Sequence, residues 1–187
     1  MKIKIINGSP RRNGSTAYIL HKIELALLKQ GVEVTFYNVI NEDIALCKGC
    51  CACYKTGRCY TNDNAEKILQ ELRNVDGIVI CSSTIASNVP GVLKTFIDRG
   101  HFVIEQLLHN QYSLCVTTYE NYGGNKASNA LKSLVTLSGA SLCGAIVQKV
   151  PFNSDYSSNL KLNAKTDKLA LKLYKEIKAP PFAKTKT

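Results

Sequence analysis

The chain has 187 residues, of which 45% are hydrophobic and 20% charged, and this length and composition predict one soluble globular domain and not a disordered or repetitive chain. The formal net charge of +10 arises largely near one end, because residues 161–187 contain eight lysines and two acidic residues. No nucleic-acid motif accompanies these lysines, so the charge indicates a solvated surface and no nucleic-acid partner is expected.

The chain is also expected to lie outside membranes, in the cytoplasm. Its longest apolar runs, such as GIVIC at residues 77–81, are far shorter than the roughly 20 residues that a membrane-spanning helix needs. Residues 1–10 enter a strand-like pattern directly, without an apolar leader or a cleavage site. In a reducing compartment, clustered cysteines indicate metal or redox chemistry and not structural disulfides.

Short apolar segments and helical patterns alternate along the chain. Strands are expected at residues 2–6, 32–37, 77–81, 112–118 and 141–150. Helices are expected at residues 15–30, 64–73, 90–109, 126–138 and 160–178. This alternation predicts a doubly wound, three-layer α/β fold with a five-stranded parallel sheet and the flavodoxin-like strand order 2-1-3-4-5, in which ligands bind at the carboxyl ends of the strands. One domain, residues 1–178, is followed in this prediction by a basic tail, residues 179–187.

The loop NGSPRRNGST, residues 7–16, joins the first expected strand to the first helix. Backbone N–H groups and the amino end of that helix can hold an anion. Hydroxyl groups and a countercharge are available from Ser9, Ser15, Thr16 and either Arg11 or Arg12. Because the glycine patterns of triphosphate and dinucleotide loops are missing, the sequence predicts a mononucleotide phosphate site, with a simple helix-capping turn as the alternative.

Five of the eight cysteines lie in CKGCCACYKTGRC, residues 47–59. Four of them have the spacing of a ligand set: Cys47, Cys50, Cys53 and Cys59. Four thiolates are the usual ligands of a [4Fe–4S] cluster; redox-active free thiols suit the same spacing equally, and a zinc site or a passive loop suits it less well. Cys51 has no part in any of these alternatives. The other cysteines, expected to be small buried hydrophobes in strands, are Cys81, Cys115 and Cys143.

No pattern indicates acid–base catalysis, and no catalytic residue is assigned. The histidines fall on expected helices without the spacing of metal ligands: His21, His101 and His109. Asp98 and Arg99 are expected to form packing or interface ion pairs.

Four motifs follow one another within residues 1–150: GSPRRNGST, CKGCCACYKTGRC, NVPGVLKTFIDR and the pair Gly123 and Gly124. Together they resemble the NAD(P)H-dependent FMN reductase and iron-sulfur flavoprotein group of flavodoxin-like proteins. The resemblance implies FMN as cofactor, NAD(P)H as transient co-substrate and a candidate [4Fe–4S] cluster at the four spaced cysteines. It assigns contacts with the FMN phosphate and ribityl chain to Ser9, Arg11, Asn13, Ser15 and Thr16.

In this group the loop after the third strand commonly reads Ser-Pro-x-Tyr-x-Gly and lines the isoalloxazine ring. Here the pattern has Ser83, Ile85 and Ser87 in place of Pro, Tyr and Gly. The resemblance therefore assigns ring contacts, partly through backbone N–H groups, to Ser83, Thr84, Ile85, Ala86 and Ser87. The loop after the fourth strand adds Tyr119, Tyr122, Gly123 and Gly124. The two tyrosines are the aromatic residues that remain for the ring; the alternative is that they are exposed loop residues without a ligand.

The resemblance implies an FMN-binding oxidoreductase that uses NAD(P)H to reduce a flavin, a quinone or another small acceptor. One alternative is an iron-sulfur flavoprotein that moves single electrons between a [4Fe–4S] cluster, FMN and a redox partner protein. A second is a non-catalytic flavodoxin-like carrier or regulator. A homodimer is expected, with the helix at residues 90–109 in its interface.

Overall fold

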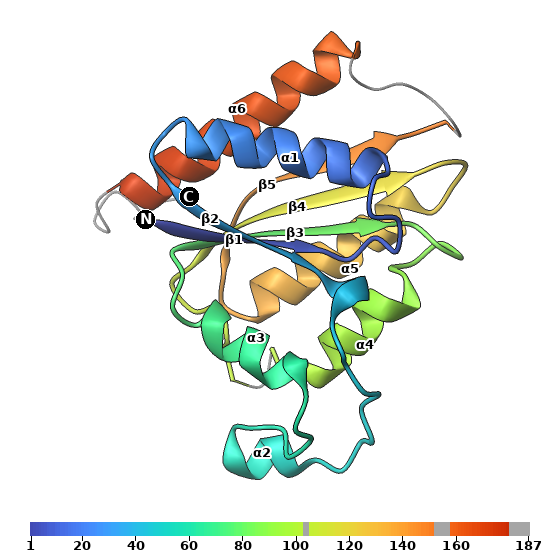
Figure 1. Ribbon diagram of the computed structural model, residues 1–187, viewed down its shortest axis with the longest axis vertical. Coiled ribbons are helices and arrows are strands. Elements are labelled where there is room, and N and C mark those ends of the chain that lie inside the picture. The colour runs from blue at the N-terminus through green and yellow to red at the C-terminus, as the bar shows by residue number, and fades with distance from the viewer. Residues whose placement is uncertain (103–104, 152–157, 180–187) are drawn as a thin grey trace.

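A computed structural model describes residues 1–102, 105–151 and 158–179 (Figure 1). All strands are parallel and form one sheet in the order β2-β1-β3-β4-β5. The strands are β1 (Lys2–Asn7), β2 (Glu33–Asn38), β3 (Gly77–Ser83), β4 (Tyr112–Tyr119) and β5 (Ser141–Lys149). The doubly wound α/β fold and the strand order predicted from the sequence are confirmed.

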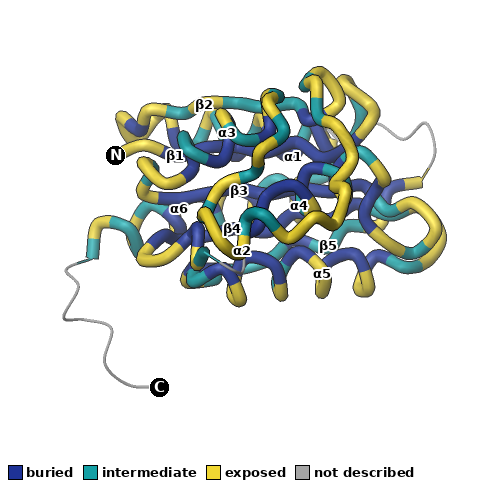
Figure 2. Tube along the Cα trace, turned by 90° about the horizontal axis from the view of Figure 1, so that it is seen from below, coloured by how far each residue is buried: buried dark blue, intermediate teal, exposed yellow. Residues whose placement is uncertain are grey.

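Helices cover both faces of this sheet (Figure 1). On one face lie α1 (Ser15–Leu28) and α6 (Leu160–Lys178). On the other lie α3 (Asn64–Leu72), α4 (Gly91–Arg99) and α5 (Gly124–Leu137). Successive strand side chains point to opposite faces, so each face has its own apolar core, and β3 is buried along its whole length, as Figure 2 shows for the centre of the sheet.

The segment between β2 and α3 contains two short elements that were not predicted. They are the 3-10 helix η1 (Val39–Asn41) and α2 (Ala52–Thr56). Helix α2 has no buried residue and lies beyond α3 and α4, at the far side of the molecule from α1 and α6 (Figure 1). The cysteine-rich segment, residues 46–62, therefore forms an arm outside the two apolar cores, the cysteine arm.

The helix expected at residues 90–109 is wrong in its second half, because α4 ends at Arg99. The chain turns back at Gly100, where an added Cβ would lie 2.0 Å from the ring of Phe102. That ring packs edge-on against Phe96, with centroids 5.6 Å apart. The aromatic contact thus overrides the helical pattern, and His101 and His109 do not lie on helices, contrary to the prediction.

The other main helices begin and end within two residues of their predicted bounds, and α6 has the bounds that were predicted. Residues 180–187, which hold nearly all of the predicted basic tail, lie outside the described residues. None of the described helices combines the length and the apolar character needed to cross a lipid bilayer.

Candidate functional site

The loops after β1, β3 and β4 meet at the carboxyl edge of the sheet (Figure 1). The hydroxyl groups of Thr16, at the start of α1, and Thr118, at the end of β4, share a hydrogen bond of 2.7 Å. A Cβ added to Gly123 would lie only 2.4 Å from the Cα atom of Ser87. The structure thus brings together all three loops for which flavin contacts were predicted.

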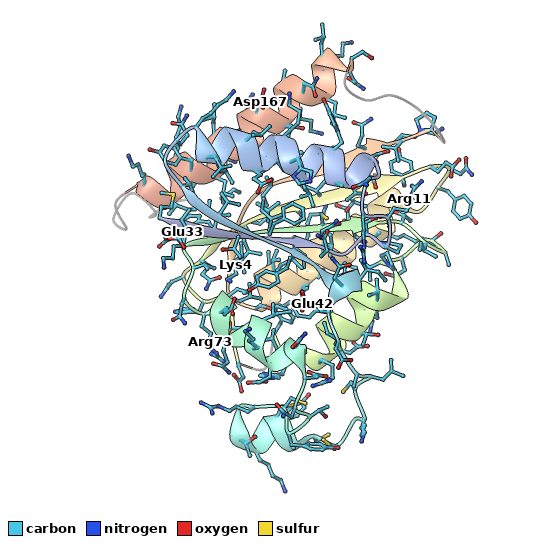
Figure 3. The ribbon with its side chains drawn as sticks, viewed as in Figure 1. Lys4, Arg11, Glu33, Glu42, Arg73 and Asp167 are labelled. Atoms are coloured by element: carbon cyan, nitrogen blue, oxygen red, sulfur yellow. The ribbon has the colours of Figure 1, made fainter. Side chains whose placement is uncertain are left out.

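The amino end of α1 has no side-chain cap. Gly14 precedes the helix and has no side chain that could accept hydrogen bonds from its first N–H groups. Arg11 folds over this position, with its Nε 3.6 Å from where a Gly14 Cβ would stand, and Figure 3 shows Arg11 beside the start of α1. Free N–H groups beside a guanidinium suit a phosphate group. Ser15 and Thr16 open the helix here, and Asn13 is exposed nearby.

Asn7 organises this loop, although no role was predicted for it. Its amide Nδ2 donates to Oδ1 of Asn38, at 2.8 Å, and so ties β1 to β2. Its Oδ1 accepts from the backbone N–H of Ser9, at 3.0 Å, and from the thiol of Cys81, at 3.3 Å. The signal in the sequence was a polar residue that directly follows the apolar pair Ile5 and Ile6 at the end of β1.

A tight turn follows β3. Ile85 and Asn88 exchange two backbone hydrogen bonds of 2.9 and 3.0 Å, and both residues between them have positive φ, 48° at Ala86 and 63° at Ser87. These are the angles of a type I′ hairpin turn, which favours Asn and Gly. A cavity of about 170 Å³ beside the turn is lined by Thr84, Ala86, Ser87, Glu120, Asn121 and Tyr122.

Polar atoms and one aromatic ring remain available at this edge. The buried hydroxyl oxygens of Ser83 and Thr84 have no hydrogen-bond partner among the described residues. Because buried polar groups are normally paired, these two atoms suit the polar edge of a ligand. Tyr119 packs on Gly124, whose added Cβ would lie 2.2 Å from the tyrosine ring. Tyr122 is 73% exposed, so it is the tyrosine that is free to contact a flat ligand.

The cysteine arm forms a second candidate site, which shares no lining residue with the first. All eight cysteines are free thiols. One pocket of the arm is lined by Cys47, Cys50, Cys51, Cys53, Cys59 and Arg99, together with five neighbouring residues. Among the described residues, no three Cys, His, Asp or Glu side chains already have the geometry of a metal site. The pocket gathers the four predicted thiols without closing them into a ligand set.

The thiols of this pocket differ in acidity. Burial raises the pKa of Cys53, and the nearby thiols of Cys59, Cys47 and Cys50 raise it further. Burial also acts to raise the pKa of Cys59, but the backbone of Thr61 and the nearby Arg99 guanidinium outweigh it and hold that pKa below its usual value. The thiolate form is therefore more accessible at Cys59 than at Cys53.

The strand cysteines are buried, which disfavours their thiolate forms. Burial raises the pKa of Cys81 and of Cys115 to about 12 and that of Cys143 to about 11. All three lie in the cores, as predicted.

Arg99 and Asp63 hold the two ends of the cysteine arm. The Arg99 guanidinium donates to the carbonyl oxygens of Ala45, at 2.9 Å, and Thr61, at 3.2 Å. It also forms a two-pronged ion pair with Asp63, whose carboxylate accepts from the N–H groups of Ala45, at 2.9 Å, and Ala65, at 3.0 Å. The predicted packing ion pair is present at Arg99, but its link to the arm was missed.

Known proteins share sequence similarity with this chain. Residues 1–154 match the family model described as NADPH-dependent FMN reductase. An iron-sulfur flavoprotein of Clostridioides difficile is 36% identical over 187 residues, which cover 97% of this chain and 83% of that protein. One from Archaeoglobus fulgidus is 38% identical over 100 residues, covering 54% of this chain and 49% of the relative. The chain thus spans about half the length of the archaeal relative.

Solved structures agree on the fold. An apo NADH:FMN oxidoreductase superposes with a TM-score of 0.69 at 17% identity, covering 97% of this chain and 92% of the other. A flavodoxin of Streptococcus pneumonia superposes with a TM-score of 0.68 at 12% identity, covering 94% and 99%. At these low sequence identities the structural similarity shows the flavodoxin-like fold alone.

Proposed function

The chain belongs to the NADPH-dependent FMN reductase family, whose members are FMN-binding oxidoreductases, and from that premise we propose that it takes electrons from NADPH or NADH and passes them to a flavin, a quinone or another small acceptor. The observation that carries this proposal is the meeting of the three loops at the uncapped amino end of α1, beside Arg11. The donors suit one phosphate, and the unpaired hydroxyls of Ser83 and Thr84 suit the polar edge of a flavin ring.

When bound, FMN would supply the hydride and electron transfer, and the protein would supply binding and orientation. Phosphate and ribityl contacts are proposed for Ser9, Arg11, Asn13, Ser15 and Thr16. Ring contacts are proposed for the turn at residues 83–87 and for Tyr119, Tyr122, Gly123 and Gly124. In this proposal Arg11 orients the phosphate, and the turn after β3 presents backbone N–H groups to the ring.

The experiment is FMN binding followed by turnover. Purified protein is mixed with FMN, and binding is followed by quenching of flavin fluorescence. NADH or NADPH oxidation is then measured with and without FMN, in the presence of a quinone acceptor. FMN binding and FMN-dependent oxidation are expected. Protein that binds no FMN contradicts the proposal, and protein that binds FMN without any turnover supports the non-catalytic carrier instead.

A second candidate function is that of an iron-sulfur flavoprotein, which exchanges single electrons with a redox partner protein. It is favoured by the four thiols that line one pocket together with the buried cation Arg99, because thiolates and a positive neighbour suit an anionic [4Fe–4S] centre. Cys47, Cys50, Cys53 and Cys59 would hold it. Anaerobic purification with iron and acid-labile sulfide analysis tests this function, and the absence of both contradicts it.

We also propose a homodimer. Exposed apolar side chains occur at both candidate sites, with exposed fractions of 74% for Leu46, 69% for Tyr54 and 51% for Ile85. A second copy of the chain would bury such surface. The molecular mass in solution, measured by light scattering, is expected to equal that of two chains, and the mass of one chain would contradict the proposal.

A further inference from the structure

Arg99 is a buried cation with an incomplete set of hydrogen bonds. Its side chain is 1% exposed. A guanidinium has five N–H donors. The two Nη atoms serve the carbonyl oxygens of Ala45 and Thr61 and both carboxylate oxygens of Asp63. Four donors are thus used, and the fifth, the N–H of Nε, remains.

That fifth donor has no acceptor in the part of the chain that the structure describes. A buried donor of a charged group is costly to leave unpaired, so an acceptor is expected nearby. Arg99 lines the pocket that the thiols share. The Cys59 thiol lies near the guanidinium: burial acts to raise the pKa of this thiol, and Arg99 acts to lower it. No sulfur of the described residues accepts from Nε in full hydrogen-bonding geometry.

We propose that Arg99 is the positioning residue of the cysteine site: it clamps both ends of the arm and donates its Nε–H to the anionic sulfur ligands that the pocket holds. This inference rests on the iron-sulfur alternative of the proposed function. A positive charge and an N–H donor stabilise the more negative, reduced form of a thiolate-bound centre, so Arg99 raises its reduction potential. A purely structural ion pair would leave the potential unchanged.

The first test is a redox titration of the reconstituted protein. In Arg99→Lys the charge stays but the Nε–H and the planar fork are lost. Its reduction equilibrium constant is expected to fall at least tenfold relative to the wild-type protein, which is 59 mV for one electron. Lys4→Arg is the matched control, because Lys4 is also a buried cation in an ion pair, with Glu71, and lines a different pocket. An unchanged potential in Arg99→Lys at equal iron content overturns the inference.

A second variant tests the same inference if Arg99→Lys does not fold. The double variant Asp63→Asn, Arg99→Met removes both buried charges together and leaves no unpaired charge behind. It also lacks the Nε–H, so the same fall in potential is expected. A wild-type potential in the double variant overturns the inference.

Hydrogen exchange of the apo protein tests the clamp without a bound cluster. Amides of residues 46–62 are expected to exchange at least tenfold faster in Arg99→Lys than in Lys4→Arg or the wild-type protein, because the clamp is weakened. Equal exchange overturns the clamp. A wild-type protein that takes up no iron or sulfide removes the iron-sulfur alternative and the Nε–H role with it, whereas the exchange rates still decide the clamp.

Discussion

The Nη2 atom of Arg99 lies 3.0 Å from Oδ1 of Asp63, and the two side chains are 1% and 7% exposed. Asp63 also caps α3 by accepting from the N–H of Ala65. One carboxylate therefore joins the end of α4, the start of α3 and the exit of the cysteine arm. Loss of its charge is expected to affect both stability and the arm.

Asp63→Asn should lower the free energy of unfolding by about 3–5 kcal/mol, because it leaves the buried guanidinium without its counterion. Urea denaturation measures the change. Asp98→Asn is the control, since Asp98 belongs to an exposed pair with Lys94 on the same helix and should cost at most about 1 kcal/mol. Equal losses in the two variants would show that the buried pair of Asp63 and Arg99 contributes no more to the free energy of unfolding than the exposed pair.

The same carboxylate predicts a dependence of stability on pH. Burial acts to raise the pKa of Asp63, but Arg99 and the N–H groups of Ala45 and Ala65 outweigh it, so the pKa in the folded protein is lowered. A group of this kind stabilises the fold fully above its unfolded pKa, about 3.9, and loses that contribution as the pH falls through the folded value. The stability difference between the wild-type protein and Asp63→Asn should be constant above roughly pH 5 and narrow below pH 4. Urea titrations across this range test it, and a constant difference down to the folded pKa would contradict it.

Ser87→Gly should stabilise the protein by about 1–2 kcal/mol, since Ser87 has a φ of 63° that costs a residue with a Cβ and suits glycine. Ser133→Gly is the matched control: Ser133 is exposed in the helical backbone of α5, where glycine should destabilise by about 0.5–1 kcal/mol. Thermal and urea denaturation measure the expected gain in stability of Ser87→Gly and the expected loss in Ser133→Gly. A destabilised Ser87→Gly would mean that the serine side chain contributes more than the backbone angle costs.

The sheet, its order and most helix bounds could be predicted because hydrophobic periodicity and loop chemistry act locally. The end of α4 could not, because it depends on the ring of Phe102 returning to Phe96, a contact that periodicity does not contain. The meeting of the loops after β1, β3 and β4 followed from the strand order, since the carboxyl ends of parallel strands lie at one edge.

The roles of Asn7 and Arg99 could not be predicted for a different reason. Asn7 contacts Asn38 and Cys81, which lie 31 and 74 residues away in sequence, and Arg99 contacts Ala45 at a separation of 54. Such polar contacts leave no periodic signal in one sequence. The positive φ values at Ala86 and Ser87 could not be predicted either, because alanine and serine are not typical of a type I′ turn.

Arg11→Ala should weaken FMN binding roughly 10- to 100-fold, the size of one charge-assisted hydrogen bond. Riboflavin, which lacks the phosphate, should bind equally well to the variant and the wild-type protein. Fluorescence titration with both flavins measures this, with Arg58→Ala, an exposed arginine of the cysteine arm, as the control. Equal losses for FMN and riboflavin would place Arg11 away from the phosphate.

Gly123→Ala should distort the site where the loops after β3 and β4 touch. Gly123 has a φ of 82°, and its added Cβ would lie 2.4 Å from the Cα atom of Ser87, so backbone must move. The left-handed angle alone costs about 1–2 kcal/mol, and the displaced turn should reduce FMN affinity in addition to the melting temperature. Gly91→Ala is the control, because nothing lies within 4 Å of its added Cβ. Unchanged FMN affinity in Gly123→Ala would show that flavin binding does not depend on the contact between these two loops.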